Sequence, residues 1–266
     1  MTDSPKAKAR TNWLAEIRSL AILALFVIGL HSLIAKPFYI PSESMMPGLQ
    51  VGDRLLVSKY PYGWSYASPS FHLLPFIKGR LFGAMPERGD VVVLSRPDEG
   101  RTDDLIKRVV GLPGDTVRMV KGRLWLNGKA VPTRDLGERL VRADANLRCD
   151  GREAAKSCRL HVLRETLPGG RSYDVLDLYP SRLDDTPAYR VPAGHVFLMG
   201  DNRDNSADSR VPLAAGGLGG AVPVENVEGR AEFITFSLKG EAGWNPLTWF
   251  PNFRTDRSGA SLRPEA

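Results

Sequence analysis

The chain has 266 residues, of which 42% are hydrophobic and 25% charged, and its formal net charge is +6. These proportions are near the averages for globular proteins and exclude a disordered tail, a collagen-like chain and a transporter with many membrane spans. The 26 glycines and 20 prolines favour many turns over long helical bundles. The basic balance would suit a nucleic acid or an anionic membrane, depending on where the charges lie.

The first predicted element is an apolar helix over residues 19–35, with the sequence SLAILALFVIGLHSLIA. It has no formal charge and covers about 26 Å of a hydrocarbon core about 30 Å thick, so we expect it to cross a membrane. Arg18 and Lys36 at its ends can reach the polar boundary. A cleaved signal peptide and a buried core helix are the alternatives. Against the signal peptide, the apolar run is long, and cleavage after Ala35 would put Leu33 at a position before the cut where a small residue is needed. Against the core helix, the run has no polar stripe of the kind that a water-facing amphipathic helix shows.

The charges beside this helix predict its orientation. Residues 1–18 contain Lys6, Lys8, Arg10 and Arg18, whereas the segment that follows the helix begins with Lys36 and is otherwise poor in basic residues. The positive-inside rule therefore places the tail 1–18 in the cytoplasm and exports the domain that follows. We expect that domain to cover residues 36–256 and the polar end, 257–266, to be a flexible tail.

The exported part is predicted to be mainly β, an antiparallel-sheet domain with a polar insertion. Alternating or continuous apolar runs between turns predict strands at residues 53–59, 90–96, 104–111, 116–120, 123–131, 195–200 and 230–238. Asn127 and Gly128 predict a hairpin turn inside the fifth run. The region of about 122–190 is more polar and is expected to form a second lobe or insertion.

Residues 61–87 are rich in aromatic and aliphatic side chains but are interrupted by Pro and Gly, which predicts a long loop. Two interpretations remain open. The loop could lie in the membrane interface, where Trp64 and Tyr66 would be well placed, or it could cover the core of its own domain.

Cys149 and Cys158 are the two cysteines of the chain. In an exported domain they can oxidise, so we favour a disulfide between them. A metal site is disfavoured, because two thiols without clustered histidines would leave zinc under-coordinated. The charges after residue 36 are mixed, without a Lys/Arg run or aromatic residues between basic ones, which argues against nucleic acid.

Two serines stand in the segment IPSESMMPGLQVGD, residues 40–53. In an extended chain Ser42 and Ser44 share a face, so one hydroxyl could attack a carbonyl while the other donates a hydrogen bond. Serines between prolines are also ordinary turn formers, and this segment alone does not choose between the two interpretations.

A lysine lies inside the apolar strand of DDLIKRVVGLPGD, residues 103–115. Burial of Lys107 would disfavour its charged form and lower its pKa, which would let the neutral amine act as a general base. The alternative is a lysine that extends to water from the edge of a strand.

The segment MGDNRDNSADSRVP, residues 199–212, is dense in Asp, Asn and Arg. A solvated acidic loop is one interpretation and a calcium loop another, but EF-hand spacing fails and Arg203 and Arg210 would compete for the carboxylates. Pairs of Asp and Arg at this density more readily hold a loop by charge-assisted hydrogen bonds.

Together, four motifs in fixed order behind an apolar helix resemble bacterial type I signal peptidases, membrane-anchored proteases that remove signal peptides. They are PSxSMxP at 41–47, RGDVVV at 88–93, IKRVVGLPGD at 106–115 and GDNRDNSxDSR at 200–210. The resemblance implies that Ser44 is the nucleophile, Lys107 the general base and Ser42 the side-chain donor of an oxyanion hole that includes the backbone N–H of Ser44. It further implies that Ser206 orients the lysine, that Asp208 and Arg210 support the site, and that the substrate contacts Ile40, Met45, Leu49, Leu55, Leu105 and Ile106.

The resemblance also implies the partners and the location. Substrates would be preprotein signal peptides with small residues at the third and first positions before the cut, the Ala-x-Ala pattern. We expect a monomer without cofactor or metal, in the bacterial inner membrane with its catalytic domain in the periplasm. Ser44 is only nine positions after Ala35, at most about 32 Å of chain, which keeps the site near the membrane.

Two other functions remain to be weighed. A self-cleaving repressor-type protease shares the Ser/Lys chemistry but would need a DNA-binding helix-turn-helix in place of the apolar run. A catalytically silent, membrane-anchored β scaffold would tolerate loss of Ser44 and Lys107. The chain also departs from some family members in having one span, Gly48 in place of Thr, and the long loop 61–87.

Overall fold

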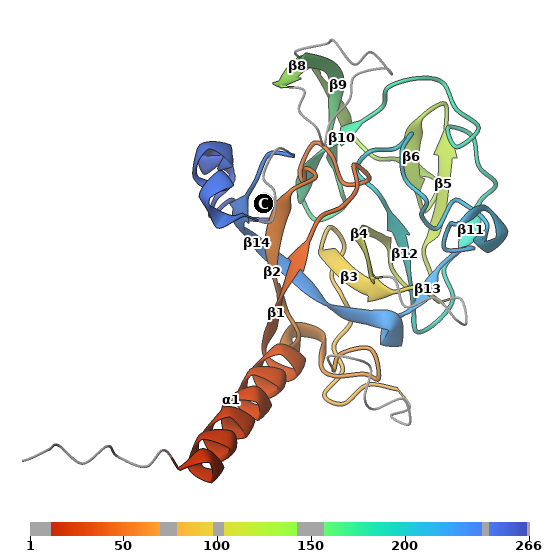
Figure 1. Cartoon of the computed structure of the whole chain (residues 1–266). Coiled ribbons are helices and arrows are strands. Elements are labelled where there is room, and N and C mark those ends of the chain that lie inside the picture. Colours follow the sequence, from red (N-terminus) through yellow and green to blue (C-terminus); the bar gives the residue numbers. More distant parts are fainter. Residues whose placement is uncertain (1–11, 70–78, 98–103, 143–156, 241–244, 265–266) are drawn as a thin grey trace, which may run out of the picture.

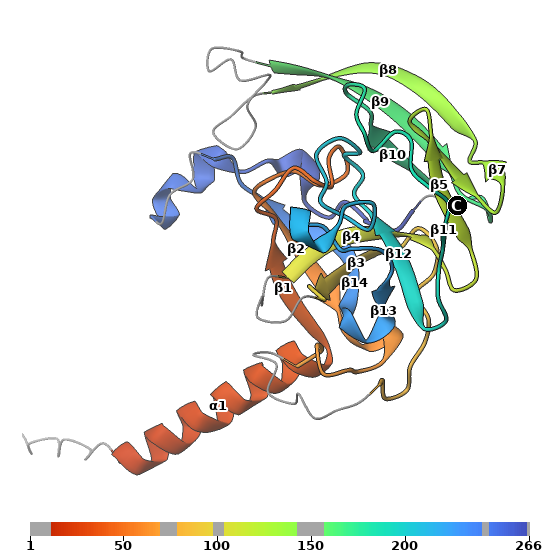
Figure 2. The same ribbon diagram turned by 90° about the vertical axis from the view of Figure 1, so that its right-hand side faces the viewer.

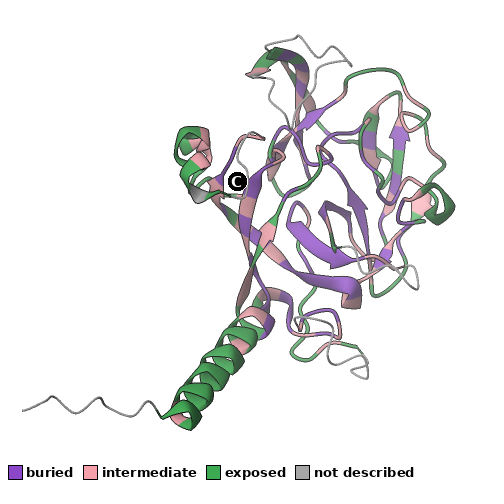
Figure 3. Ribbon diagram, in the orientation of Figure 1, coloured by how far each residue is buried: buried purple, intermediate pink, exposed green. Residues whose placement is uncertain are grey.

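The computed structural model describes residues 12–69, 79–97, 104–142, 157–240 and 245–264. A single long helix, α1 (Trp13–Leu33), projects from a body made of β-strands (Figure 1). Figure 3 shows that this helix is exposed along most of its length and becomes partly buried where it meets the body, whereas the strands of the body are largely buried. The mainly β fold with one N-terminal apolar helix confirms the predicted fold class.

Helix α1 begins and ends earlier than the predicted range 19–35. Asn12 caps it by accepting a hydrogen bond from the Ala15 backbone N–H, which lets the helix begin six residues sooner. It ends at Leu33 because Ala35 already pairs in a strand. Its 21 residues span about 32 Å, which matches the thickness of a hydrocarbon core, and the charged residues Glu16 and Arg18 lie near its start, where they can reach the polar boundary.

The main sheet has seven antiparallel strands. In spatial order they are β1 (Ala35–Tyr39), β2 (Asp53–Ser58), β14 (Val227–Ser237), β3 (Val91–Ser95), β4 (Asp104–Gly111), β12 (His195–Met199) and β13 (Val222–Pro223). Side chains on β3 alternate between two apolar clusters: Val91 and Val93 pack on one face of the sheet, Val92 and Leu94 on the other. Burial of both faces explains why this strand is a continuous apolar run.

The insertion forms two smaller sheets that arch over the main one (Figure 2). One contains β11 (Tyr189–Arg190), β5 (Thr116–Val120), β6 (Arg123–Leu126) and β7 (Lys129–Ala130); the other contains β10 (Ser172–Leu176), β9 (Ser157–Thr166) and β8 (Thr133–Arg142). Asn127 and Gly128 turn between β6 and β7 with φ of 52° and 77°, as expected for a tight hairpin. Cys158 on β9 is disulfide-bonded. Cys149, its expected partner, lies outside the described residues.

Short 3-10 helices occur in the connections, at Tyr60–Tyr62, Leu213–Ala215, Val224–Asn226, Pro246–Thr248, Phe250–Asn252 and Thr255–Arg257. The first begins the long loop 61–87, whose described parts behave differently. Tyr62 and Ala67 are buried against the domain, whereas residues 81–85 are all exposed. The first part therefore covers the core, as one of the two interpretations of this loop required.

The C-terminal segment differs from the flexible tail predicted over 257–266. Residues 259–262 pair with β14, with Gly259 N–H donating to the Ile234 carbonyl at 2.7 Å and Leu262 N–H donating to the Glu232 carbonyl at 2.9 Å. Leu262 also packs against the apolar cluster of the main sheet. The polar composition of the segment concealed this pairing, because its ordering contacts are main-chain bonds and one apolar side chain.

Arg257 ties this segment to the loop between β1 and β2. Its guanidinium donates to both carboxylate oxygens of Asp53, at 2.9 and 2.6 Å, and to the Gly48 carbonyl at 2.9 Å. Asp53 is completely buried, so this two-bond pair holds a charge that would otherwise lack a cation. The last residues of the chain thereby hold the loop that contains Ser42 and Ser44.

We predict that Arg257→Met lowers the free energy of unfolding by about 3 kcal/mol, because it leaves the buried Asp53 carboxylate without its ion-pair partner. Arg263→Met is the matched control: Arg263 pairs with Glu232 at the surface, and its loss should cost less than about 1 kcal/mol. Denaturant unfolding of the full chain in detergent measures both. Equal small losses would contradict the structural role of Arg257.

Candidate active site

Ser44 lies in the loop between β1 and β2, which two backbone hydrogen bonds close at its base. Ile40 N–H donates to the Asp53 carbonyl at 2.9 Å, and Gly52 N–H donates to the Ile40 carbonyl at 3.0 Å. The sequence favours a loop here because Pro41 and Pro47 cannot donate to a strand ladder. Ser44 is 8% exposed, and its Oγ is 3.3 Å from the Oγ of Ser42. The two hydroxyls are thus neighbours, as the spacing predicted.

Lys107 approaches Ser44 from strand β4. Its Nζ is 3.1 Å from Ser44 Oγ and 2.9 Å from the Ile106 carbonyl oxygen, and the residue is 3% exposed. Strand β4 is fixed in this position by two neighbours. Strand β3 pairs with it over residues 104–108, and β12 pairs with it on the other edge from Arg108 onward. The structure therefore brings together two residues that are 63 positions apart in the sequence.

Burial lowers the pKa of Lys107 to about 8. The Asp208 carboxylate acts in the opposite direction and raises the pKa, while the Arg96 guanidinium lowers it. A substantial fraction of the amine is therefore neutral near physiological pH. A neutral amine 3.1 Å from a serine hydroxyl can accept its proton.

The loop 199–212 supports Ser44 from the other side. Asn202 N–H donates to the Ser44 carbonyl at 3.1 Å. A Cβ at Gly200 would collide with the Ser44 carbonyl oxygen and with Ser206 Oγ, so only glycine allows this close approach. Ser206 is buried beside the site, but its Oγ has no hydrogen-bond partner within the described part of the chain. The lysine is hydrogen-bonded to the Ile106 carbonyl, whereas the family resemblance implied that the Ser206 hydroxyl orients it.

Asp208 and Arg210 form the buried ion pair that the sequence predicted for this loop. Arg210 donates to the two carboxylate oxygens at 3.0 and 2.8 Å, and Asp208 also accepts the Gly200 N–H at 3.0 Å. Burial alone would raise the pKa of Asp208, but the guanidinium and the backbone donors lower it below the ordinary value. The carboxylate therefore stays ionised and holds Gly200 in place.

A second set of buried charges was not predicted as a unit. Arg108 pairs with Asp201 through two bonds, at 2.7 and 2.6 Å, and its guanidinium lies 4.2 Å from the ring centroid of Tyr173. Arg203 pairs likewise with Glu165 of β9, at 2.7 and 2.6 Å. Arg108 follows Lys107 in one motif, and Asp201 and Arg203 stand in the motif at 200–210. The motifs therefore include three of the four charged residues in these pairs. Tyr173 and Glu165 stand in the insertion, where no motif marks them.

Five of the six predicted substrate-contacting residues lie in one apolar cluster: Ile40, Met45, Leu49, Leu55 and Ile106. Leu105 packs instead against the cluster on the opposite face of the sheet. The reason is the alternation of a strand, which points adjacent side chains to opposite faces. Leu105 and Ile106 therefore do not line the same apolar surface.

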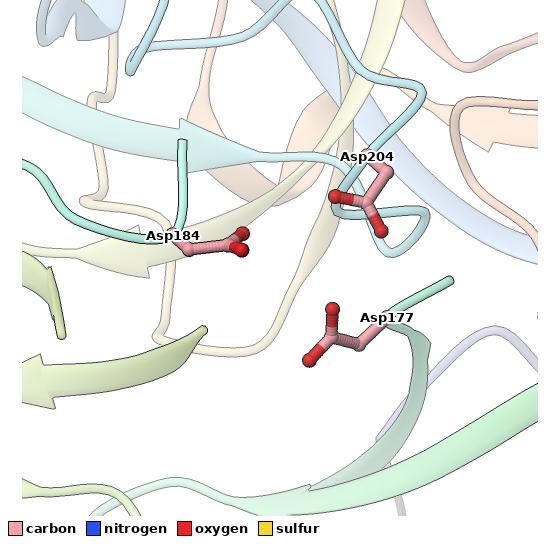
Figure 4. Close-up of side chains that lie close together, drawn as sticks. All are labelled: Asp177, Asp184 and Asp204. Atoms are coloured by element: carbon pink, nitrogen blue, oxygen red, sulfur yellow. The ribbon is translucent and has the colours of Figure 1, made fainter. Parts of the chain in front are cut away.

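Three carboxylates lie close together where the loop 199–212 approaches the segment after β10: Asp177, Asp184 and Asp204 (Figure 4). One oxygen from each lies within 4.8 Å of the others. Two of the three already cap turns, since Asp204 accepts the Leu178 N–H at 2.6 Å and Asp184 accepts the Ser181 N–H at 2.8 Å. Burial raises the pKa of Asp177, and the two neighbouring carboxylates raise it further. These contacts explain the cluster as part of the loop framework.

Known proteins are similar in sequence to this chain over most of its length. The family model described as "Signal peptidase, peptidase S26" matches residues 11–236. Signal peptidase I of Rickettsia canadensis (strain McKiel) is 35% identical over 245 residues, 89% of this chain and 82% of that protein. Signal peptidase I of Rickettsia conorii (strain ATCC VR-613 / Malish 7) is 34% identical over 259 residues, 94% of this chain and 87% of that protein.

A crystal structure of a signal peptidase I from Enterococcus faecalis V583 is also similar, with 23% identity and a TM-score of 0.28; the match covers 55% of this chain and 97% of that chain. The family assignment depends on the sequence matches, which extend over most of this chain and most of each relative. The chain therefore belongs to the signal peptidase family, peptidase S26, and is an enzyme that removes signal peptides.

Proposed function

We propose that this signal peptidase cleaves preproteins with Ser44 as nucleophile and neutral Lys107 as general base. The observation that carries the proposal is the buried contact of 3.1 Å between Lys107 Nζ and Ser44 Oγ. Burial lowers the pKa of the amine to about 8, so its neutral form is accessible without a histidine.

The steps follow from this geometry. Ser44 Oγ attacks the scissile carbonyl carbon while Lys107 Nζ takes the hydroxyl proton, giving a tetrahedral intermediate. Ser42 Oγ and the Ser44 backbone N–H donate hydrogen bonds to the oxyanion. The ammonium of Lys107 then protonates the departing amine, which leaves an ester on Ser44. A water molecule deprotonated by Lys107 hydrolyses this ester and frees the signal peptide.

Two strand edges beside the dyad could hold an extended substrate. Strand β12 pairs with β4 only at Arg108, Val109 and Gly111, so the edge of β4 over residues 104–107 has no strand partner among the described residues. The outer edge of β1 is likewise unpaired in the described part of the sheet. A peptide can add to such an edge through main-chain hydrogen bonds and present alternate side chains to the apolar cluster.

Small side chains suit the substrate positions nearest the cut. The five clustered residues, Ile40, Met45, Leu49, Leu55 and Ile106, are each 8% exposed or less. Little of their surface is free for a substrate, so we propose that only small side chains are accommodated beside them. This supports the Ala-x-Ala pattern that the family resemblance implies.

The helix α1 supports a membrane location. It is long and apolar enough to cross a membrane, and none of its apolar window is buried in the protein. Three basic residues before the helix, Lys6, Lys8 and Arg10, and Arg18 in its second turn favour a cytoplasmic N-terminus by the positive-inside rule. We propose a single-pass protein of the bacterial inner membrane, with its catalytic domain in the periplasm.

Loss of either member of the dyad tests the proposed mechanism. We predict that Ser44→Ala reduces preprotein cleavage to the uncatalysed level and that Lys107→Ala reduces it by at least about 10²-fold, the usual contribution of a general base. Lys129→Ala, at an exposed position of β7, is the matched control and should cleave normally. Cleavage of a preprotein in detergent micelles, followed on gels, measures all three. Normal processing by both dyad variants would overturn the proposed roles of Ser44 and Lys107.

The pH profile tests the neutral amine. Only unprotonated Lys107 can accept the Ser44 proton, so kcat/KM should rise tenfold per pH unit below about pH 8 and level off above it. Initial rates with a soluble peptide substrate from pH 6 to pH 10 provide the measurement. A flat profile across this range would rule out the proposed base.

The oxyanion donor is tested at Ser42. We predict that Ser42→Ala lowers kcat by about 10² to 10³ with little change in KM, because the lost hydrogen bond forms fully only in the transition state. Ser42→Thr keeps the hydroxyl and should retain most of the activity. Steady-state kinetics of both variants decide the point, and an unchanged kcat in Ser42→Ala would remove this residue from the mechanism.

A further inference from the structure

Glu43 stands between the two serines of the site and takes no part in the proposed mechanism. Its carboxylate oxygen Oε2 accepts one hydrogen bond, from the Asn205 side-chain amide at 3.2 Å. Within the described part of the chain, no cation forms an ion pair with Glu43, and its other carboxylate oxygen accepts no hydrogen bond. An unpaired carboxylate is thus one residue away from the nucleophile.

Other carboxylates around the dyad differ from Glu43 in having an arginine of their own. Each accepts two hydrogen bonds from one guanidinium, in the pairs Asp208 with Arg210, Asp201 with Arg108, Glu165 with Arg203 and Asp53 with Arg257. Glu43 is half-buried. Burial raises its pKa and only the Asn205 amide lowers it, so no positive charge of the protein compensates this carboxylate. A cation supplied by a substrate would be favoured beside it.

Two asparagines of the loop 199–212 fix the position of Glu43. The Asn202 side-chain amide donates to the Glu43 carbonyl at 3.3 Å, and the Asn202 backbone N–H donates to the Ser44 carbonyl at 3.1 Å. Asn205 N–H donates to the Asn202 carbonyl at 3.2 Å, so both side-chain amides project from one turn. Glu43 is therefore held on the side of the site that this loop forms. It is not among the charges that shift the pKa of Lys107.

The strand edges that could hold a substrate both end at the dyad. Strand β1 ends at Tyr39, five positions before Ser44, and the free edge of β4 ends at Lys107, because β12 pairs with β4 from Arg108 onward. Met199 of β12 lies opposite Arg108, so the loop 199–212 begins where that free edge ends. Substrate residues before the cut would lie along the edges. Those after the cut would then pass over the loop, beside Glu43.

We infer that the Glu43 carboxylate, held by Asn205, contacts the first two substrate residues after the cut and favours a basic side chain there over an acidic one. The inference rests on the proposed dyad and on the proposed binding of substrate along the two strand edges. A fixed carboxylate attracts an ammonium or guanidinium group and repels another carboxylate, so it discriminates between substrates by both effects. Glu43 thereby adds a charge preference after the cut to the size preference before it.

Cleavage of a peptide series by the full chain in detergent tests this preference. The peptides share one sequence before the cut and have Lys, Gln or Glu at the first or the second residue after it. The wild-type kcat/KM should be about tenfold higher for Lys than for Glu, with Gln between them, because attraction and repulsion each act at surface strength. In Glu43→Gln this ratio should fall to about twofold or less. Glu138→Gln is the matched control, since Glu138 is exposed on β8, and it should keep the wild-type ratio.

The outcomes separate this inference from the proposed function. A ratio that is the same in Glu43→Gln as in the wild type would overturn the inference, and so would a loss of discrimination at residues before the cut instead of after it. Because each ratio is taken within one variant, a general loss of activity or folding cancels. Cleavage of the Gln peptide by Ser44→Ala would overturn the dyad, whatever the ratios are.

Salt and a second variant test the electrostatic origin and the role of Asn205. Raising NaCl from about 0.05 M to about 0.5 M should reduce the wild-type ratio, because salt screens exposed charges, and should hardly change it in Glu43→Gln. Asn205→Ala releases the carboxylate and should lower the ratio part of the way to that of Glu43→Gln. A wild-type ratio that salt leaves unchanged would overturn recognition by charge, and an unchanged ratio in Asn205→Ala would overturn the positioning role of Asn205.

Discussion

The proposed proton transfer from Ser44 to Lys107 requires an amine that is buried and yet not held in its charged form by a carboxylate. Asp208 and Asp201 are the carboxylates whose charges act on the lysine. Each is already paired with an arginine through two bonds, Asp208 with Arg210 and Asp201 with Arg108. The arginines thus keep the carboxylates from holding the proton on Lys107, so burial dominates and its pKa falls.

Buried arginine–carboxylate pairs also position the loops around Ser44 and Lys107. The loop between β1 and β2 and the loop 199–212 have little regular structure, so their backbones need other constraints. Arg257 holds the first through Asp53 and the Gly48 carbonyl, and Arg203 holds the second through Glu165 of the insertion. Buried ion pairs contribute little net stability, but removing one partner is costly. Their effect here is to allow one arrangement of each loop.

Much of the fold could be predicted because its strands are local patterns. The alternation in 104–111, the continuous apolar run in 91–95 and the Asn127-Gly128 turn are each visible within a few residues. The serine and lysine of the site could be predicted from motifs in a fixed order. The short distance between their side chains could not be predicted, because it depends on how the sheet brings β4 to the loop after β1.

Long-range contacts could not be predicted where the residues that make them stand in no recognisable motif. Arg257 lies in a polar segment that looks like a frayed end, and its role depends on Asp53, 204 positions away. Arg80 looks like a surface charge, yet four of its acceptors are backbone carbonyls that carry no sequence signal. Leu105 was grouped with Ile106 by its place in a motif, whereas the alternation of the strand separates the two. Pattern within an element is therefore predictive, and pairing between elements is not.

The connection between helix and sheet sets where the enzyme can act. Helix α1 ends at Leu33 and β1 begins at Ala35, and the Ile34 carbonyl between them accepts the Lys59 N–H at 2.8 Å. The join is thus bonded to Lys59, directly after β2, and to the indole of Trp64, which donates to the Leu33 carbonyl, and no flexible linker separates helix and strand. Strand β1 spans about 17 Å, so with α1 in the bilayer the dyad stands at a fixed and short height above the membrane. If the proposed mechanism and membrane location hold, a cleavage site far from the bilayer would not reach Ser44 even if its residues fit. Selection of the cut would then depend on its distance from the membrane as well as on the small side chains that we propose beside it.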